Sequence, residues 1–210
     1  DDTADTTPGN PWADPSDRPL VLVGLSSTVM RQERLLQRAA DALGQLPVRG
    51  LVTTGPAVDP ALIAAPPNVT VARWVRHADV LPHCSAVITH GGHGTVMKAL
   101  IAGIPQVVVP LGRDQPDNAA RVVYEGAGVR LRKNASARAL RAAVARVIED
   151  PRYRAGAARM ASRLAAERDA NLAVDELERV AAAAPRLTRP AGAPRPGQPA
   201  AGRPAGRTHG

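Results

Sequence analysis

The 210-residue sequence has no Phe, two Trp, two Tyr and one Cys. With so few aromatic side chains, a core has to be built from Val, Leu, Ile and Ala, which suits parallel strands covered by helices on both faces. The single cysteine, Cys84, excludes an internal disulfide and fits a reducing compartment. No apolar run approaches the length of a membrane span, and the N-terminus lacks a signal-peptide pattern. We therefore expect a cytoplasmic protein with no membrane partner.

The net charge of +8 is distributed unevenly. Residues 1–19 hold five Asp and one Arg, whereas residues 185–210 hold five Arg and no acid. A sequence pI of about 11 suggests a nucleic-acid binder as one alternative. Between these ends, however, the basic residues are spread over predicted helix surfaces with few aromatics among them. We interpret them as solvated faces with some attraction for an anionic ligand, and expect no nucleic-acid partner.

Three segments differ in composition. Residues 1–19 are rich in Asp, Thr and Pro without any period, which indicates a linker. Residues 20–184 alternate short apolar runs with helical patterns, which indicates one domain. Residues 185–210 contain mainly Pro, Ala, Gly and Arg, and we expect them to be disordered because they cannot bury a core.

The alternation within the domain predicts an α/β fold with a doubly wound parallel sheet, Rossmann-like in class. The expected strands are 20–25, 48–54, 68–72, 86–89, 106–109 and 128–131. The expected helices are 31–46, 78–82, one from the glycine turn to about 102, 116–126, one capped by Ser136, 151–168 and 171–184.

The most informative stretch is residues 87–100, in which a β-branched run leads into His-Gly-Gly-His-Gly-Thr and then into a helical pattern. Glycines let the backbone approach an anion, and the helix N-terminus offers unpaired N–H groups and a partial positive charge. Neither GxxxxGK[ST] nor GxGxxG is present. The stretch indicates an anion site, and a tight turn without a ligand is the alternative.

Polar clusters follow four of the predicted strands. Since ligands bind outside the carboxyl ends of parallel strands, these clusters should converge on one rim. They are Ser26-Ser27-Thr28, Arg73-Trp74, His90–Thr95 and Gly112–Gln115.

Each cluster has a chemical use and a structural alternative. The hydroxyls of Ser26, Ser27 and Thr28 can close over a diphosphate held by the glycine turn. Trp74 can stack on a nucleobase or fill the core. Asp114 and Gln115 can bind sugar hydroxyls or cap the next helix.

A metal site is a separate alternative, because four possible ligands lie close together in the sequence. Their spacing matches no zinc template, and three glycines would leave them loosely held. We therefore expect no metal. The four residues are His83, Cys84, His90 and His93.

Three motifs together resemble a known family: residues 74–77 (WVRH), 90–95 (HGGHGT) and 110–119 (PLGRDQPDNA). In type, order and spacing they resemble the C-terminal, donor-binding half of the UDP-glycosyltransferase family, which has the GT-B fold. The bacterial branch that glycosylates macrolides and other natural products, in antibiotic biosynthesis, is the most similar. The resemblance covers about residues 18–184.

The resemblance implies a nucleotide-sugar substrate and no other cofactor. By it, Trp74 stacks on the base and the backbone of Val75 meets the base edge. His90 and the turn with Gly92, Gly94 and Thr95 hold the diphosphate. Asp114 and Gln115 would contact the donor sugar. The other side of the sugar would be lined by three residues with hydroxyl groups, Ser26, Ser27 and Thr28.

The family reaction is an inverting transfer to an acceptor hydroxyl, here of a small natural product, and its catalytic base, a His paired with Asp, lies in a preceding acceptor-binding domain. Residues 1–19 are too few for that domain, so we expect the base and the acceptor pocket outside this sequence, and no catalytic residue within it. A non-catalytic nucleotide-sugar-binding module, or an inactive truncated fragment, is the alternative.

The sequence departs from the family pattern at two places. Arg76-His77 replaces a frequent Pro-Gln, and Lys98 replaces a Glu that in related plant enzymes binds the ribose of a UDP-sugar. An ammonium only donates hydrogen bonds and cannot accept from two ribose hydroxyls. Lys98 therefore favours a dTDP-sugar over a UDP-sugar as donor, unless it points to solvent.

Overall fold

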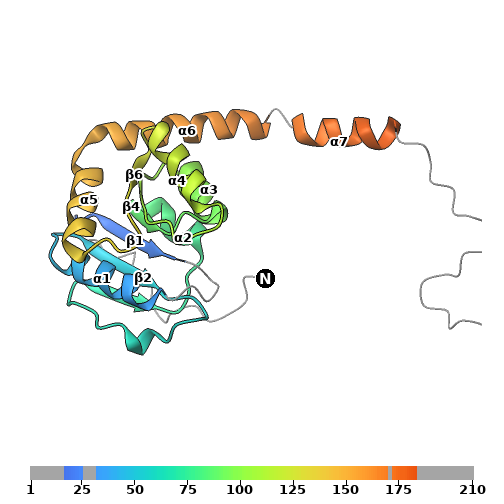
Figure 1. Ribbon diagram of the computed structural model, residues 1–210. Helices are drawn as coiled ribbons and strands as arrows, with labels where there is room; N and C mark the ends of the chain where they lie inside the picture. The colour runs from blue at the N-terminus through green and yellow to red at the C-terminus, as the bar shows by residue number, and fades with distance from the viewer. Residues whose placement is uncertain (1–16, 26–31, 170–171, 184–210) are drawn as a thin grey trace, which may run out of the picture. The chain divides into compact units, whose positions relative to one another are not determined.

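The computed structural model describes residues 17–25, 32–169 and 172–183. Its centre is a parallel sheet with strand order β3-β2-β1-β4-β5-β6 (Figure 1). The strands are β1 (Leu20–Gly24), β2 (Arg49–Thr53), β3 (Val69–Ala72), β4 (Cys84–Thr89), β5 (Gln106–Val108) and β6 (Gly128–Arg130). The expected doubly wound parallel sheet is confirmed.

Helices lie between these strands and after the last one, at the places that the apolar periodicity predicts. They are α1 (Glu33–Gly44), α2 (His77–Val80), α3 (His93–Ile101), α4 (Gln115–Tyr124), α5 (Ala137–Glu149), α6 (Pro151–Asp169) and α7 (Leu172–Ala183), with 3₁₀ turns η1 (Pro60–Leu62) and η2 (Leu81–His83). The expected cap of α5 is present, because the Ser136 Oγ accepts a hydrogen bond from the Ala139 backbone N–H at 3.2 Å.

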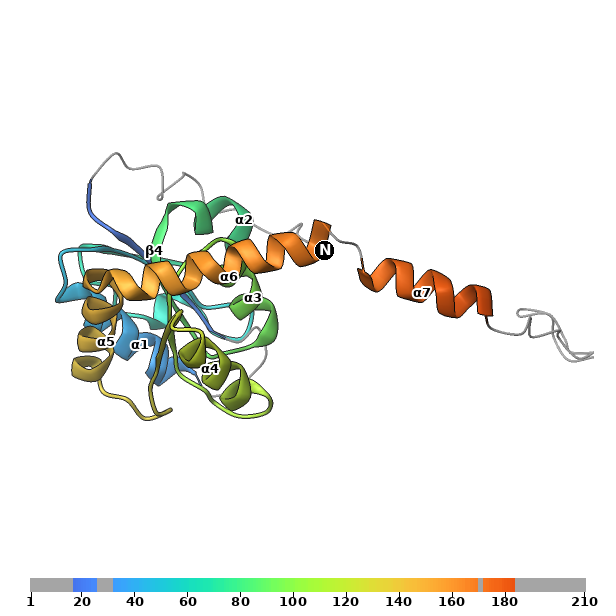
Figure 2. The same ribbon diagram turned by 90° about the horizontal axis from the view of Figure 1, so that it is seen from above.

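The sheet is buried on both faces, since alternate residues of a strand point to opposite sides. Val21 and Val23 of β1 pack in the cluster that includes α1 and α5. Leu20 and Leu22 pack in the cluster that includes α2 and α3. A third cluster joins α3 and α4 to α6 (Figure 2). The core is aliphatic, as the missing aromatics required.

One strand starts earlier than predicted. β4 begins at Cys84, not at Ala86, because Cys84 pairs with Leu20 before the register shifts and Ala86 pairs with Val21. Burial raises the pKa of the Cys84 thiol to about 12, so the sulfur is a core atom and no nucleophile.

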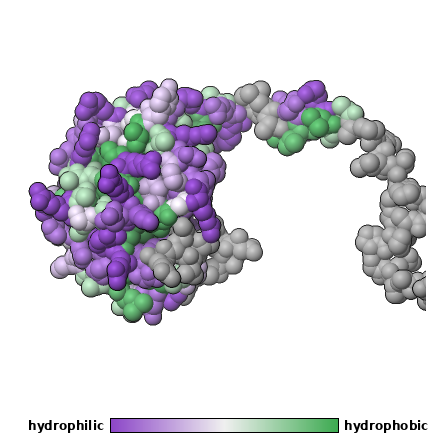
Figure 3. Space-filling view, viewed as in Figure 1, coloured by the Kyte–Doolittle hydropathy of each residue, from purple (hydrophilic) through white to green (hydrophobic). Residues whose placement is uncertain are grey.

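α7 forms a unit separate from the preceding residues and is described by itself. It exposes Val174, Leu177 and Val180, part of the green surface on this helix in Figure 3. Among the described helices, none is both long and apolar enough to cross a membrane. The tail 185–210 and most of the predicted linker lie outside the described residues and stay predictions.

Candidate functional site

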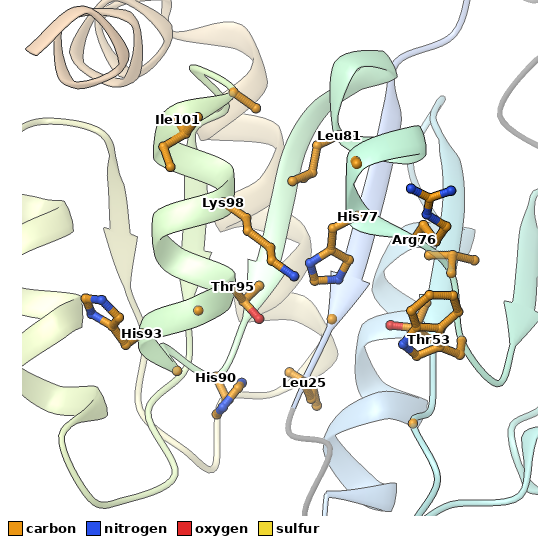
Figure 4. Close-up of a pocket in the computed structure, with 18 of the residues that line it drawn as sticks. Leu25, Thr53, Arg76, His77, Leu81, His90, His93, Thr95, Lys98 and Ile101 are labelled. Carbon is orange, nitrogen blue, oxygen red and sulfur yellow. The ribbon is translucent and has the colours of Figure 1, made fainter. Parts of the chain in front are cut away.

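A cavity of about 790 Å³ opens at the carboxyl ends of the strands (Figure 4). Segments that follow β1 to β5 line it, as expected of the rim of a parallel sheet. Eight of the residues singled out from the sequence are among those that line it: Trp74, Val75, His90, Gly92, Gly94, Thr95, Asp114 and Gln115. Ser26, Ser27 and Thr28 lie outside the described residues.

The glycine turn is shaped by close packing. Gly91 has φ +90°, and a Cβ there would lie 2.9 Å from the Val108 Cγ1. A Cβ on Gly92 would overlap the imidazole of His90. A Cβ on Gly94, by contrast, would meet no atom within 4 Å, so Gly94 borders open space. The first two glycines are needed to form the turn, and the third is not.

Helix α3 begins in this turn. Gly92 is its N-cap residue and provides no side-chain cap. The N–H groups of the first helical turn therefore lack the partner that a Ser, Thr, Asp or Asn cap supplies. Gly94 and Thr95, both in that turn, line the cavity. The helix presents a partial positive charge and hydrogen-bond donors at the cavity.

His90 lies at the start of the turn and is only 8% exposed. Burial lowers its pKa below the ordinary value, against the opposing effects of the Asp114 charge and a hydrogen bond with the Gly24 backbone. The imidazole is thus neutral at pH 7 and has a nearby carboxylate that favours its protonation. His93 is exposed, and in Figure 4 it points away from Lys98.

The charged side chains of the cavity wall are mostly cationic. Four basic side chains and one carboxylate are among its lining residues: Arg73, Arg76, Lys98 and Arg113, with Asp114. Arg76 also forms an exposed pair with Asp79 at 3.9 Å, which is too weak to neutralise it. Figure 4 shows the Lys98 amino group directed toward the His77 ring. Lys98 therefore lines the cavity while remaining exposed to solvent, and its role toward a donor stays a prediction.

Trp74 and Val75 follow β3, and their side chains lie in different environments. Trp74 is half-buried and lines the cavity, so the alternative in which it fills the core is wrong. The Val75 side chain is 5% exposed and belongs to the core cluster beneath the cavity. Packing of Val75 thus anchors the backbone that carries the indole.

The loop after β5 is held by Gln115. The Gln115 Oε1 accepts hydrogen bonds from the backbone N–H of Leu111 at 2.7 Å and of Gly112 at 3.0 Å. This commits the side-chain oxygen to the loop. Asp114 stands at the N-cap position of α4 without a side-chain cap, so the capping alternative is wrong for Asp114.

Other lining residues were not singled out from the sequence. Thr53 and Gly55 follow β2, where the rule of polar residues after strands would have found them. Arg113, which belongs to the predicted Gly112–Gln115 cluster, also lines the cavity, and its φ of +57° is uncommon for a residue with a Cβ. The residues adjacent to it in the sequence do not predict that left-handed conformation.

The metal interpretation finds no support in the geometry. Cys84 begins β4, and His90 follows the last residue of the same strand. The described residues contain no group of three or more His, Cys, Asp or Glu placed to hold a metal ion.

A second groove of about 610 Å³ lies between the loop after β5 and the segment that follows β6. It is lined in part by Pro110, Pro116 and the basic residues Arg130, Arg132 and Lys133. We call it the β6 groove.

Comparison with known proteins identifies relatives over most of the chain. Residues 37–180 match the family model described as erythromycin biosynthesis protein CIII-like, C-terminal domain. The chain is similar to 4'-demethylrebeccamycin synthase of Lentzea aerocolonigenes, with 41% identity over 177 residues. That similarity covers 83% of this chain but 41% of the relative, so the chain spans less than half the length of the relative.

Solved structures agree with the sequence comparison. A glycotransferase of kitacinnamycin superposes with a TM-score of 0.71 at 31% identity, over 77% of this chain and 43% of that one. The glycosyltransferase VinC, solved in complex with DTDP, superposes with a TM-score of 0.69 at 26% identity, over 82% of this chain and 44% of that one.

Proposed function

The chain belongs to the family of erythromycin biosynthesis protein CIII-like C-terminal domains, and we propose that it binds the nucleotide-sugar donor of a glycosyltransferase. Its fold is that of the C-terminal half of GT-B glycosyltransferases. Relatives of this half are glycosyltransferases, and the chain covers under half of their length. Activity of the complete enzyme, its acceptor and its other domain are therefore parts of the proposal.

One observation carries the proposal. The uncapped N-terminus of α3 opens into a cavity whose other lining residues include four basic side chains and a half-buried indole. A nucleoside diphosphate has both features that such a cavity recognises, an anionic group for the helix N-terminus and a flat base for the indole. The DTDP found in VinC, a neighbour of the same fold, supports this ligand class.

In the proposed complex, the turn from His90 to Thr95 holds the diphosphate and Trp74 stacks on the base. Asp114 accepts hydrogen bonds from the sugar hydroxyls. The reaction is an inverting transfer, in which a base from the other half deprotonates the acceptor hydroxyl, the hydroxyl oxygen attacks the anomeric carbon, and the nucleoside diphosphate leaves. This half stabilises the leaving group, since the helix dipole and nearby cations offset the growing negative charge.

The donor is proposed to be a dTDP-sugar. Lys98 and His77 line the same cavity as Trp74, and Asp114 is the one carboxylate among the described lining residues. A ribose diol is best recognised by a carboxylate that accepts from both hydroxyls, and Lys98 only donates. A deoxyribose has no 2′-hydroxyl, so a thymidine nucleotide loses less binding free energy at a site without that carboxylate.

Calorimetry with TDP and UDP tests the donor class. The native chain is expected to bind TDP more tightly, and Lys98→Glu is expected to narrow the preference by restoring an acceptor for the 2′-hydroxyl. Tighter binding of UDP by the native chain, or a Lys98→Glu variant with both affinities unchanged, would refute the role of Lys98.

A non-catalytic nucleotide-sugar-binding module is the second candidate, since the cavity accounts for donor binding alone. Both candidates bind the donor, and a sugar-transfer assay separates them. Under the first, addition of the acceptor-binding half of a related enzyme restores transfer to a hydroxylated acceptor. Under the second, it does not.

A further inference from the structure

Asn118 lies in the first turn of α4 and is half-buried. It does not line the cavity, yet its side-chain amide contacts two parts of the site. Its Nδ2 donates to the Gly91 backbone carbonyl at 2.9 Å and to the Asp114 Oδ2 at 2.8 Å. One side chain thus joins the glycine turn to the loop after β5.

The chemistry of these contacts fixes the orientation of the amide. An amide nitrogen has two hydrogens, and both are used here. The flipped amide would place its oxygen against a carbonyl and a carboxylate, neither of which donates. The amide nitrogen, with its two hydrogens, satisfies both acceptors at this position.

The two acceptors are themselves constrained. Gly91 has φ +90°, and a Cβ there would lie 3.1 Å from the Gln115 backbone carbonyl oxygen, so the turn packs directly against the start of α4. The Asp114 carboxylate commits Oδ2 to Asn118, which orients its other oxygen, Oδ1. Because hydrogen bonds to charged groups are stronger than those between neutral groups, this solvent-exposed contact favours one orientation of the carboxylate.

We propose that Asn118 is a positioning residue that aligns the Asp114 carboxylate with the glycine turn. The inference rests on the proposed function, in which the turn holds the diphosphate and Asp114 contacts the donor sugar. Asn118 then sets the distance between the two, and its loss affects the contribution of the sugar to binding more than that of the nucleotide.

The test measures the dissociation constants of TDP and TDP-glucose and takes their ratio, which isolates the sugar contribution. Asp114→Ala is expected to weaken TDP-glucose relative to TDP by about two- to tenfold, the size of one hydrogen bond. Asn118→Ala is expected to shift the ratio in the same direction by a similar factor. The double variant is expected to shift it no further, because the two residues act as a unit.

Two further variants separate positioning from packing. Asn118→Asp keeps the shape but replaces both donors with a carboxylate, so it is expected to shift the ratio at least as far as Asn118→Ala. Arg121→Ala, at an exposed position of the same helix and outside the cavity wall, serves as the matched control and should leave the ratio at the native value. Thermal unfolding of each variant confirms that it is folded.

The outcomes are distinguishable. If the native chain does not bind TDP, the proposed function fails. If the native chain binds TDP and Asp114→Ala shifts the ratio, but Asn118→Ala and Asn118→Asp leave it unchanged, the positioning role is refuted. Additive shifts in the double variant, or no shift from Asp114→Ala, refute it as well.

Discussion

Replacing Trp74 by alanine separates a ligand-stacking indole from a structural one. The side chain is half-buried against the cavity and absent from the buried core. Loss of base stacking is expected to weaken nucleotide binding by about 1–3 kcal/mol, which is about 5- to 150-fold in the dissociation constant. A fully buried large side chain would instead cost about 3–5 kcal/mol of folding free energy. For a half-exposed indole we expect no more than about 2 kcal/mol.

The sequence itself provides the assay. Trp74 is one of two tryptophans, the other being Trp12. A Trp12→Phe background makes the fluorescence of Trp74 observable alone, and TDP is expected to quench it on saturation. Trp74→Phe keeps an aromatic face and should retain most of the affinity, which calorimetry measures independently of the lost signal.

Two results would refute this reasoning. A folded Trp74→Ala variant with native affinity would remove the indole from the site. A loss of folding free energy above about 3 kcal/mol in urea denaturation would return Trp74 to the core, whatever its effect on binding.

Three further predictions follow from the turn and the buried groups. Gly91→Ala should destabilise the fold by about 1–3 kcal/mol in urea denaturation, because Gly91 has a positive φ and close contacts. Gly94→Ala should fold normally and bind TDP more weakly, since its Cβ would enter open space beside the ligand. Equal stability of the two variants would contradict the account. Because the pKa of His90 is lowered in the free protein and an anion would raise it, TDP affinity should increase from pH 8 to pH 6 more steeply than in His90→Gln. Without ligand, folding free energy should decrease as pH falls below about 6.5, where the unfolded chain takes up a proton first, and this decrease should be smaller in His90→Gln. Cys84, with a pKa of about 12, should resist alkylation at pH 8 in the folded chain and react once the chain is unfolded.

The architecture was predictable because the sequence repeats one signal. Each buried strand is a short aliphatic run, and each helix has an apolar face, so the alternation defines a parallel sheet without further information. The rule that ligands bind at the carboxyl ends of the strands predicts that Trp74, His90 and Asp114 lie at one rim, and the three residues line one cavity.

The sequence did not reveal contacts that depend on side-chain direction. Gln115 was expected to contact a sugar, yet its side-chain oxygen is committed to the backbone of its own loop. Asn118 was part of the 110–119 motif but was given no role, because nothing local distinguishes an Asn that bridges residue 91 to residue 114 from an exposed one on a helix. Such roles arise from tertiary proximity between segments 27 residues apart.

The same limit applies to the start of β4. The pairing of Cys84 with Leu20 and the register shift after it depend on the neighbouring strand, so a pattern within one segment cannot reveal them. Arg113 is similar, since its left-handed conformation occurs in the loop whose backbone the Gln115 side chain holds.

The central claim is that the N-terminus of α3 holds the diphosphate, and amide chemical shifts of the 210-residue chain during titration with TDP test it most directly. The account predicts saturable shifts that are largest at the amides of His93, Gly94 and Thr95 and at the Trp74 indole N–H, with the β6 groove unaffected. No shifts at millimolar TDP, or shifts centred on Arg130, Arg132 and Lys133 instead, would contradict it.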